Sequence, residues 1–306
     1  MNGKPTCSLY PTIVTPFFED GRIDYESLSR LVALFARAGL DGVFAVCQSS
    51  EMFFLDDEEK LELAAFTLNE CRKHGLKCVV SGHTQDALDD QIKYLKRLEA
   101  LKADAIILVN NRLAAENEGE DRLLSRLNAI LDALKPDTRL GVYECPYPYK
   151  RTISDELLDA MLKDGRFYFV KDTCCHSEMI RHRLSKLAGS NIALYNANSA
   201  TLYESIRDGA RGYSGIMLNI MPEVFVRFAQ SVAGGDAPKA QLLSDYIAVT
   251  SVIEYQNYPA NAKYILTRRG IFSNAITRNG KPPLTESQIK EVDAFMAMNK
   301  LMLSKL

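Results

Sequence analysis

The chain has 306 residues, of which 47% are hydrophobic and 25% are charged, and its formal net charge at pH 7 is −2. This composition is typical of a soluble globular protein, and the near-neutral charge argues against nucleic acid or an anionic membrane surface as a partner. No apolar run reaches the roughly 20 residues that a membrane-spanning helix needs, so we expect no membrane association.

Short apolar segments alternate along the chain with amphipathic segments of helical periodicity. The apolar segments are mostly unbroken runs of Val, Ile, Leu, Phe and Ala, which is typical of parallel strands covered on both faces. Strands are expected at Leu9–Val14, Gly42–Val46, Lys77–Ser81, Ala105–Val109, Leu140–Glu144, Phe167–Lys171, Ile192–Asn196 and Gly212–Ile216. Helices are expected at Tyr25–Ala38, Asp57–Lys73, Ala87–Leu101, Asp121–Leu134, Asp155–Lys163, Glu178–Lys186, Ala200–Asp208 and Pro222–Ala233.

Eight successive strand–helix units predict an α/β fold, a (β/α)8 TIM barrel with a C-terminal helical extension. A doubly wound sheet is the alternative, but no glycine-rich dinucleotide-binding turn follows the first strand. Beyond the barrel, helical spacing predicts helices at Lys239–Tyr255, Ala262–Gly270 and Thr285–Leu303. We therefore expect a catalytic barrel domain over residues 1–235 and a helical segment packed on it over residues 236–306.

The cysteines and the N-terminal stretch both favour a cytoplasmic protein. The stretch MNGKPTCSLY has no apolar core and no cleavage site, so we expect no secretory signal. The seven cysteines show no Cys-x-x-Cys pair and no nearby histidine arrangement suited to zinc. We expect reduced thiols, no metal and no cofactor. The adjacent Cys174 and Cys175 are expected to pack in the core, with the alternative that one of them lines a pocket.

One lysine stands at the end of the sixth predicted strand, where a run of four apolar residues leads directly into Lys171. Lysine is rarely buried without a function, because loss of hydration disfavours its ammonium and lowers its pKa. A neutral amine in a dry pocket can attack a carbonyl and form a Schiff base. The alternative is that Lys171 lies just beyond the strand and extends its amine into water.

Polar residues follow several other predicted strands, at the rim where the active sites of such barrels lie. Tyr143 ends the fifth strand, beside the strand of Lys171, so its phenol is a candidate proton shuttle for imine formation. The alternative is an aromatic side chain that only packs at the rim. The other polar positions at strand ends include Gln48, Ser49, Ser50, Arg112, Asn196 and Gly215.

Three stretches carry a resemblance to a known family: YPTIVTPFFEDGRIDYESLSRLVALFARAGLDGVF, YECPYPYKRT and VKDTCCH. In these stretches the chain resembles the dihydrodipicolinate synthase / N-acetylneuraminate lyase family of pyruvate-dependent class I aldolases. The resemblance implies that Lys171 forms the Schiff base and that Tyr143 is the acid/base residue that serves it. It also implies a homotetramer, built as a dimer of dimers.

The chain departs from the family's pattern at the loop that holds the substrate carboxylate. That loop reads Gly-x-x-Gly-Glu in the family but Cys-Gln-Ser-Ser-Glu over residues 47–51 here, without either glycine. Gln48 stands where the family has a hydroxyl that relays protons, and an amide is a poor relay. Ser49 can still contact a carboxylate. Arg112 and Arg151 are candidate cations for an acidic group, and Asn196 is a candidate partner for hydroxyls.

The sequence therefore predicts a class I, Schiff-base-forming carbon–carbon or carbon–oxygen lyase that acts on pyruvate or a related 2-keto acid. Lys171 and Tyr143 are the predicted catalytic residues. The predicted substrate-binding residues are Gln48, Ser49, Ser50, Arg112, Arg151, Asn196, Gly215 and Ile216.

Two alternatives remain open. One is a degenerate family member that binds a small carboxylate without efficient turnover, which the altered loop favours. The other is a metal-dependent or flavin-dependent barrel enzyme, which the lack of a His, Asp and Glu cluster after the strands disfavours.

Overall fold

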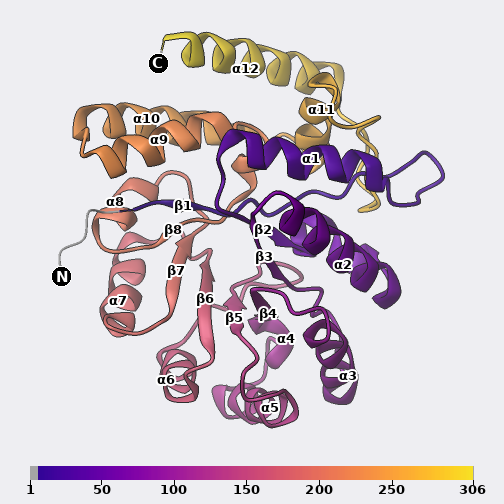
Figure 1. Cartoon of the computed structure of the whole chain (residues 1–306), viewed down its shortest axis with the longest axis vertical. Coiled ribbons are helices and arrows are strands. Elements are labelled where there is room, and N and C mark those ends of the chain that lie inside the picture. The colour runs from indigo at the N-terminus through magenta and orange to yellow at the C-terminus, as the bar shows by residue number, and fades with distance from the viewer. Residues whose placement is uncertain (1–5, 306) are drawn as a thin grey trace.

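Eight parallel strands form one sheet in the order β1-β8-β7-β6-β5-β4-β3-β2 in the computed structural model, which describes residues 6–305 (Figure 1). A parallel bridge between Thr12 and Phe44 joins the two ends of this order and closes the barrel. The predicted (β/α)8 barrel is thereby confirmed. The strands are β1 (Ser8–Leu9), β2 (Gly42–Ala45), β3 (Lys77–Val80), β4 (Ala105–Val109), β5 (Leu140–Tyr143), β6 (Phe167–Asp172), β7 (Ala193–Asn196) and β8 (Gly212–Tyr213).

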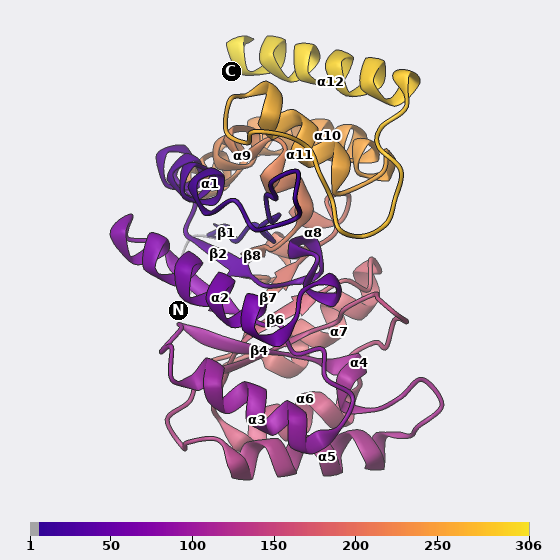
Figure 2. The same ribbon diagram turned by 90° about the vertical axis from the view of Figure 1, so that its right-hand side faces the viewer.

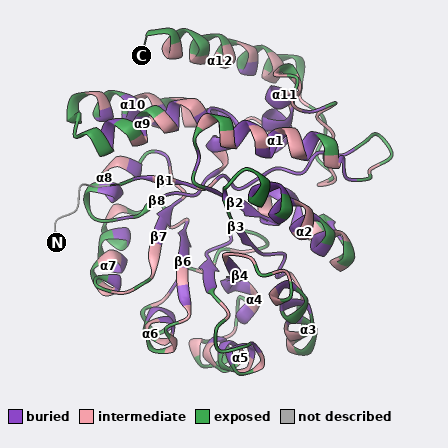
Figure 3. Cartoon of the chain, in the orientation of Figure 1, coloured by how far each residue is buried: buried purple, intermediate pink, exposed green. Residues whose placement is uncertain are grey.

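Helices surround the barrel, and the residues that they bury, which Figure 3 colours purple, are mostly apolar. They are α1 (Tyr25–Ala38), α2 (Asp57–Lys73), α3 (Leu88–Glu99), α4 (Asn110–Leu113), α5 (Glu120–Ala133), α6 (Asp155–Asp164), α7 (Ser177–Leu187), α8 (Leu202–Arg207) and α9 (Pro222–Gly234). Capping defines several of their ends: Asp24 accepts a hydrogen bond from the Ser27 N–H at the start of α1, and Gly39 ends that helix with a positive φ.

Three further helices follow the barrel: α10 (Ala237–Thr250), α11 (Ala260–Arg268) and α12 (Glu286–Lys305). Helix α10 packs against α9, and α12 lies farthest from the barrel in both views (Figures 1 and 2). The predicted C-terminal helical extension is confirmed, whereas the division of the chain at residue 235 stays a prediction. None of the helices within residues 6–305 has the length and apolar character needed to cross a membrane.

The structure differs from the sequence-based expectation where strands and helices end. The first strand is shorter than expected, because Pro11 has no N–H to donate to a neighbouring strand. The eighth ends before Gly215, where the chain turns into the 3-10 helix η3 (Ile216–Asn219). The helix expected to reach Tyr255 changes after Thr250 into the 3-10 helix η4 (Ser251–Tyr255). Residues 1–5, part of the stretch expected not to be a signal, and Leu306 lie outside the described residues.

Aromatic side chains fill part of the barrel interior. The rings of Phe169 and Tyr195 stack with centroids 4.3 Å apart, and Tyr10 meets both rings edge-on. The ring of Phe44 lies 6.1 Å from that of Phe169 and 5.5 Å from that of Tyr143, between ring centroids. Such contacts add to the free energy of burial and hold the strand ends in a fixed arrangement.

The pairing of β1 with β8 depends on a glycine. Gly212 pairs with Ser8 of β1, and a Cβ atom at position 212 would lie 1.9 Å from the Ser8 carbonyl oxygen. We expect Gly212→Ala to lower the free energy of unfolding by about 2–4 kcal/mol, because the backbone of β1 must move away. Urea unfolding measures the change.

Gly234 supplies the matched control. It lies in α9, and a Cβ atom there would meet nothing within 4 Å. Gly234→Ala should leave the free energy of unfolding unchanged or raise it by up to about 1 kcal/mol. Equal effects of the two substitutions would show that the close contact between position 212 and Ser8 does not determine the stability of the fold.

Candidate active site

A cavity of about 570 Å³ opens at the carboxyl ends of the barrel strands. Loops that follow β2, β5, β6, β7 and β8 contribute to its wall, and residues from the C-terminal segment close one side of it. Six of the residues predicted from the sequence line it: Gln48, Ser49, Tyr143, Lys171, Gly215 and Ile216.

Lys171 is buried at the end of β6, where the residue is only 4% exposed. Its Nζ lies 4.3 Å from the centre of the Tyr143 ring, because Tyr143 is its partner in the β5–β6 register. Among residues 6–305 no group accepts a hydrogen bond from this amine. Burial lowers the pKa of Lys171 to about 8, since the charged form loses its hydration. The alternative in which the amine extends into bulk water does not fit this burial.

The phenol of Tyr143 faces the altered loop. Its hydroxyl donates a hydrogen bond to Gln48 Oε1 over 3.4 Å, and the Cys145 thiol contacts the same oxygen at 3.6 Å. Burial raises the pKa of Tyr143 well above its usual value, so the phenol keeps its proton at neutral pH. An amide oxygen accepts this bond but has no proton to pass on. The Gln48 amide NH₂, in contrast, makes no hydrogen bond within residues 6–305.

The loop over residues 47–55 forms two short 3-10 turns, η1 (Gln48–Ser50) and η2 (Met52–Phe54). Ser50 turns inward, where its hydroxyl donates to the Ile13 carbonyl at 2.6 Å and accepts from the Cys47 N–H. Ser49 lines the cavity, and its hydroxyl lies 3.2 Å from Thr12 Oγ1. Ser50 therefore shapes the loop and does not face the cavity, in contrast to its predicted substrate-binding role.

A buried ion pair anchors the same loop to the C-terminal segment. Glu51 adopts a left-handed conformation with φ 60°, and its carboxylate lies 2.5 Å from Lys263 Nζ of α11. The second carboxylate oxygen accepts the backbone N–H of Arg278 at 2.6 Å. Both partners of the ion pair are almost fully buried, so the loss of either one would leave an uncompensated charge. This anchor holds the loop without the two glycines of the family's pattern.

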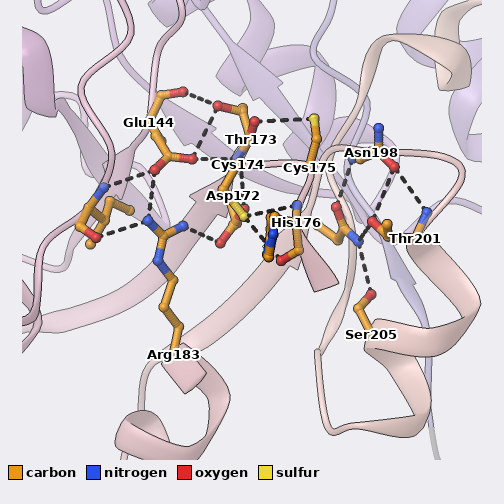
Figure 4. A network of polar contacts seen from close by, with 12 residues as sticks. Glu144, Asp172, Thr173, Cys174, Cys175, His176, Arg183, Asn198, Thr201 and Ser205 are labelled. Carbon is orange, nitrogen blue, oxygen red and sulfur yellow. Dashed lines mark hydrogen bonds and ion pairs between the residues drawn. The ribbon is translucent and has the colours of Figure 1, made fainter. Parts of the chain in front are cut away.

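Figure 4 shows a second buried ion network, which is centred on Arg183. Arg183 of α7 lies between the carboxylates of Glu144 and Asp172, at 2.9 and 2.5 Å. The two carboxylates directly follow Tyr143 and Lys171 in sequence. Glu144 also accepts the backbone N–H of Thr173. The network thus joins the ends of β5 and β6.

Sequence reasoning missed this network, although a signal was present. Arg183 lies on the face of α7 that also carries the buried Ile180 and Leu187. A charged residue on the buried face of a helix indicates a buried partner of opposite charge. Here the partners are the acidic residues next to the two candidate catalytic side chains.

Three more predicted binding residues lie away from the cavity. Arg112 pairs with Asp86 at 3.2 Å, because the short helix α4 begins directly after β4 and directs this side chain toward the loop that precedes α3. Arg151 pairs with Glu120 at 2.6 Å. Asn196 is buried, and its amide donates to the hydroxyls of Thr201 and Ser205. The structure does not bring these side chains to the wall of the cavity.

Several cavity residues were not among the predicted binding residues. Cys175 lines the cavity and is exposed, which fits the alternative given for the adjacent cysteines. Glu254 and Lys281 come from the C-terminal segment, whose position over the barrel rim cannot be deduced from local sequence patterns. Lys150 and Tyr258 are further polar residues of the wall. Within residues 6–305 no group of three or more His, Cys, Asp or Glu side chains could hold a metal ion.

The chain is similar to proteins of one family over almost its whole length. The family model of the dihydrodipicolinate synthetase family matches residues 6–299. A 4-hydroxy-tetrahydrodipicolinate synthase of Laribacter hongkongensis is 25% identical over 268 residues, which cover 84% of this chain and 87% of the relative.

Two solved structures have the same fold. YagE of E. coli, a prophage protein in complex with pyruvate, has a TM-score of 0.86 at 18% identity and covers 96% of this chain and 99% of its own. A catalytic lysine mutant of the Ruminococcus gnavus sialic acid aldolase has a TM-score of 0.87 at 19% identity, with 98% of each chain covered. At these identities the similarity establishes the fold alone.

Replacing Lys171 with Met should stabilise the fold at neutral pH. The pKa of this amine is about 8 in the fold against 10.5 in the unfolded chain, so protonation opposes folding. The expected gain at pH 7 is about 3 kcal/mol. As the pH rises from about 8 to 10.5, the folded wild type loses its proton first and regains stability, so the difference should shrink toward zero.

Urea unfolding of the wild type and Lys171→Met at a series of pH values measures this difference. A difference that does not change with pH, or a loss of stability at pH 7, would mean that the amine is not desolvated in the fold.

Removal of Arg183 should be costly, because Arg183→Met leaves Glu144 and Asp172 buried without a counter-charge. We expect the free energy of unfolding to fall by about 3–5 kcal/mol. Arg181→Ala is the control on the same helix, since Arg181 is half exposed and pairs with surface carboxylates. Its loss should cost less than about 1 kcal/mol. Similar costs for the two variants would contradict a special role for the buried network.

Proposed function

Because the chain belongs to the dihydrodipicolinate synthetase family, we propose that it is a class I lyase or aldolase that forms a Schiff base with pyruvate or a related 2-keto acid. The observation that carries this proposal is the amine of Lys171, which is buried at the cavity floor beside Tyr143 and has a pKa lowered to about 8. At pH 7.5 about a quarter of such an amine is neutral, against about one in a thousand for an ordinary lysine.

The first step is the attack of the neutral Lys171 amine on carbon 2 of the keto acid. The nitrogen gains a bond to carbon 2, and the carbonyl oxygen leaves as water after it has taken up two protons. One of these protons comes from the amine, and the Tyr143 phenol, which stays protonated at neutral pH, is placed to donate the other.

The resulting protonated imine makes the next step possible. Its positive nitrogen accepts the electron pair that remains on carbon 3 when this carbon loses a proton or when the bond to carbon 4 breaks. The product of either event is an enamine, which can return the electron pair to a proton or to an aldehyde.

The altered loop provides groups that suit the carboxylate of the keto acid. The Gln48 amide NH₂ has no partner within residues 6–305, and the Ser49 hydroxyl also lines the cavity. Both can donate to a carboxylate oxygen. Gly215 and Ile216 also line the cavity. With the loop held by the Glu51–Lys263 pair, nothing favours the alternative of a degenerate protein without turnover.

The proposal covers the direction of the reaction and the assembly of the protein. The proteins that the chain resembles include a 4-hydroxy-tetrahydrodipicolinate synthase and a sialic acid aldolase, so the proposed activity includes both condensation and cleavage. We also propose a homotetramer in the cytoplasm, with no nucleic acid or membrane partner. The exposed apolar side chains of Leu242, Val249, Met298 and Leu301 on α10 and α12 support an interface between copies of the chain.

Borohydride reduction in the presence of pyruvate tests the proposed function. The intact mass of the wild type should increase by one reduced pyruvate adduct, and Lys171→Ala should show none. Lys281→Ala, which removes another cavity lysine, should keep the adduct. The trapping rate should rise with pH and level off above about 8, because only the neutral amine adds to the carbonyl. No adduct with pyruvate or with a series of other 2-keto acids would refute the proposed function.

A further inference from the structure

Glu254 is a carboxyl group in the cavity that the steps above do not use. It lies on η4 and lines the same cavity as Lys171. Within residues 6–305 its side chain forms no hydrogen bond and no ion pair. The side chain is partly buried in the cavity wall, and a carboxyl group that is withdrawn from water without a partner is costly to a fold. Its orientation into the cavity therefore suggests that its partner is a bound molecule.

The position of η4 places Glu254 on the opposite side of Lys171 from Tyr143. Tyr143 is on β5, which neighbours the strand of Lys171. The 3-10 helix η4 packs on η3, which follows β8, two strands away from β6 in the other direction. The titratable groups that interact electrostatically with Glu254 are Lys171, Tyr213 and Tyr258. A substrate chain that extends from Lys171 would thus have an acid/base group on each side.

The protonation of Glu254 suits proton transfer in both directions. Burial raises its pKa to about 7, while the positive charge of Lys171 acts in the opposite direction. At neutral pH the carboxyl group is therefore present in both forms, which is the condition under which a general acid/base works best. Tyr143 is less suited to accept a proton, because its phenol stays protonated and donates to an amide that cannot relay.

We propose that Glu254 is a second general acid/base of this cavity, which exchanges a proton with the oxygen on carbon 4 of a substrate joined to Lys171. This inference rests on the proposed function. In cleavage, the bond between carbons 3 and 4 breaks and its electron pair forms the enamine, while the carbon 4 hydroxyl gives its proton to the Glu254 carboxylate and becomes an aldehyde. In condensation, carbon 3 of the enamine attacks the aldehyde carbon, and protonated Glu254 donates its proton to the aldehyde oxygen.

The test separates imine chemistry from carbon–carbon bond formation. Imine and enamine formation are measured by borohydride trapping with pyruvate and by exchange of the pyruvate methyl protons in D₂O. Bond formation is measured as product from pyruvate and a panel of glyoxylate, glycolaldehyde and glyceraldehyde. The variants are Glu254→Gln, which keeps the size but cannot ionise, and Glu254→Asp, which keeps the acid. Tyr255→Phe is the control, because it alters the neighbouring cavity residue.

We expect Glu254→Gln to keep trapping and exchange within about twofold of the wild type and to lose about a hundredfold or more in condensation. Glu254→Asp should recover part of the loss, and Tyr255→Phe should resemble the wild type. At saturating pyruvate, wild-type condensation should fall as the pH rises through about 7, because only the protonated carboxyl donates, and this limb should be absent in Glu254→Gln.

Three results would overturn the inference. Unchanged condensation by Glu254→Gln would show that Glu254 has no role, and an equal loss of trapping and condensation would show a structural role only. A wild type that traps pyruvate but condenses with no aldehyde of the panel would refute the role of Glu254 and leave the proposed function standing. Failure of the wild type to trap any 2-keto acid would instead refute the proposed function itself.

Discussion

The removal of water from the end of β6 is the constraint on which the site depends. Desolvation is the largest influence on the pKa of Lys171, and it must exceed the opposite effect of the nearby carboxylates of Glu144 and Asp172. Those carboxylates lie on either side of Arg183, whose positive charge offsets theirs. The same contacts hold the ends of β5 and β6 together, so the network that limits the electrostatic penalty also fixes the distance between Tyr143 and Lys171.

Residues of the C-terminal segment form one side of the cavity. Lys263 of α11 holds Glu51 and with it the loop that carries Gln48 and Ser49. The 3-10 helix η4, a few residues earlier in the chain, brings Glu254 to the same cavity. The helices beyond the barrel therefore contribute to the chemistry of the rim as well as to packing. This arrangement also explains how the loop keeps its shape after the loss of both glycines: an ion pair and inward hydroxyl bonds replace backbone flexibility.

The sequence was sufficient to predict features that depend on local patterns. Unbroken apolar runs and helical spacing predict the barrel, and adjacency of consecutive strands predicts that Tyr143 lies beside Lys171. Contacts between distant segments could not be predicted in this way. Lys263 and Glu51 are 212 positions apart, and no local pattern indicates that they meet. The direction of the Arg112 side chain could not be predicted for a related reason: it depends on the turn of α4, which brings Arg112 to Asp86, so its predicted binding role stays a prediction.

A titration of the lysine side chains by NMR tests the central proposal most directly. In protein labelled with ¹³C at the lysine ε-carbon, we expect a resonance that titrates with a midpoint near pH 8 and that is lost in Lys171→Met. Lys263, whose pKa burial also lowers to about 8, should remain as a second shifted resonance in that variant. If the resonance lost in Lys171→Met titrates near 10.5, as an exposed lysine does, the amine is not desolvated and the proposed mechanism is wrong.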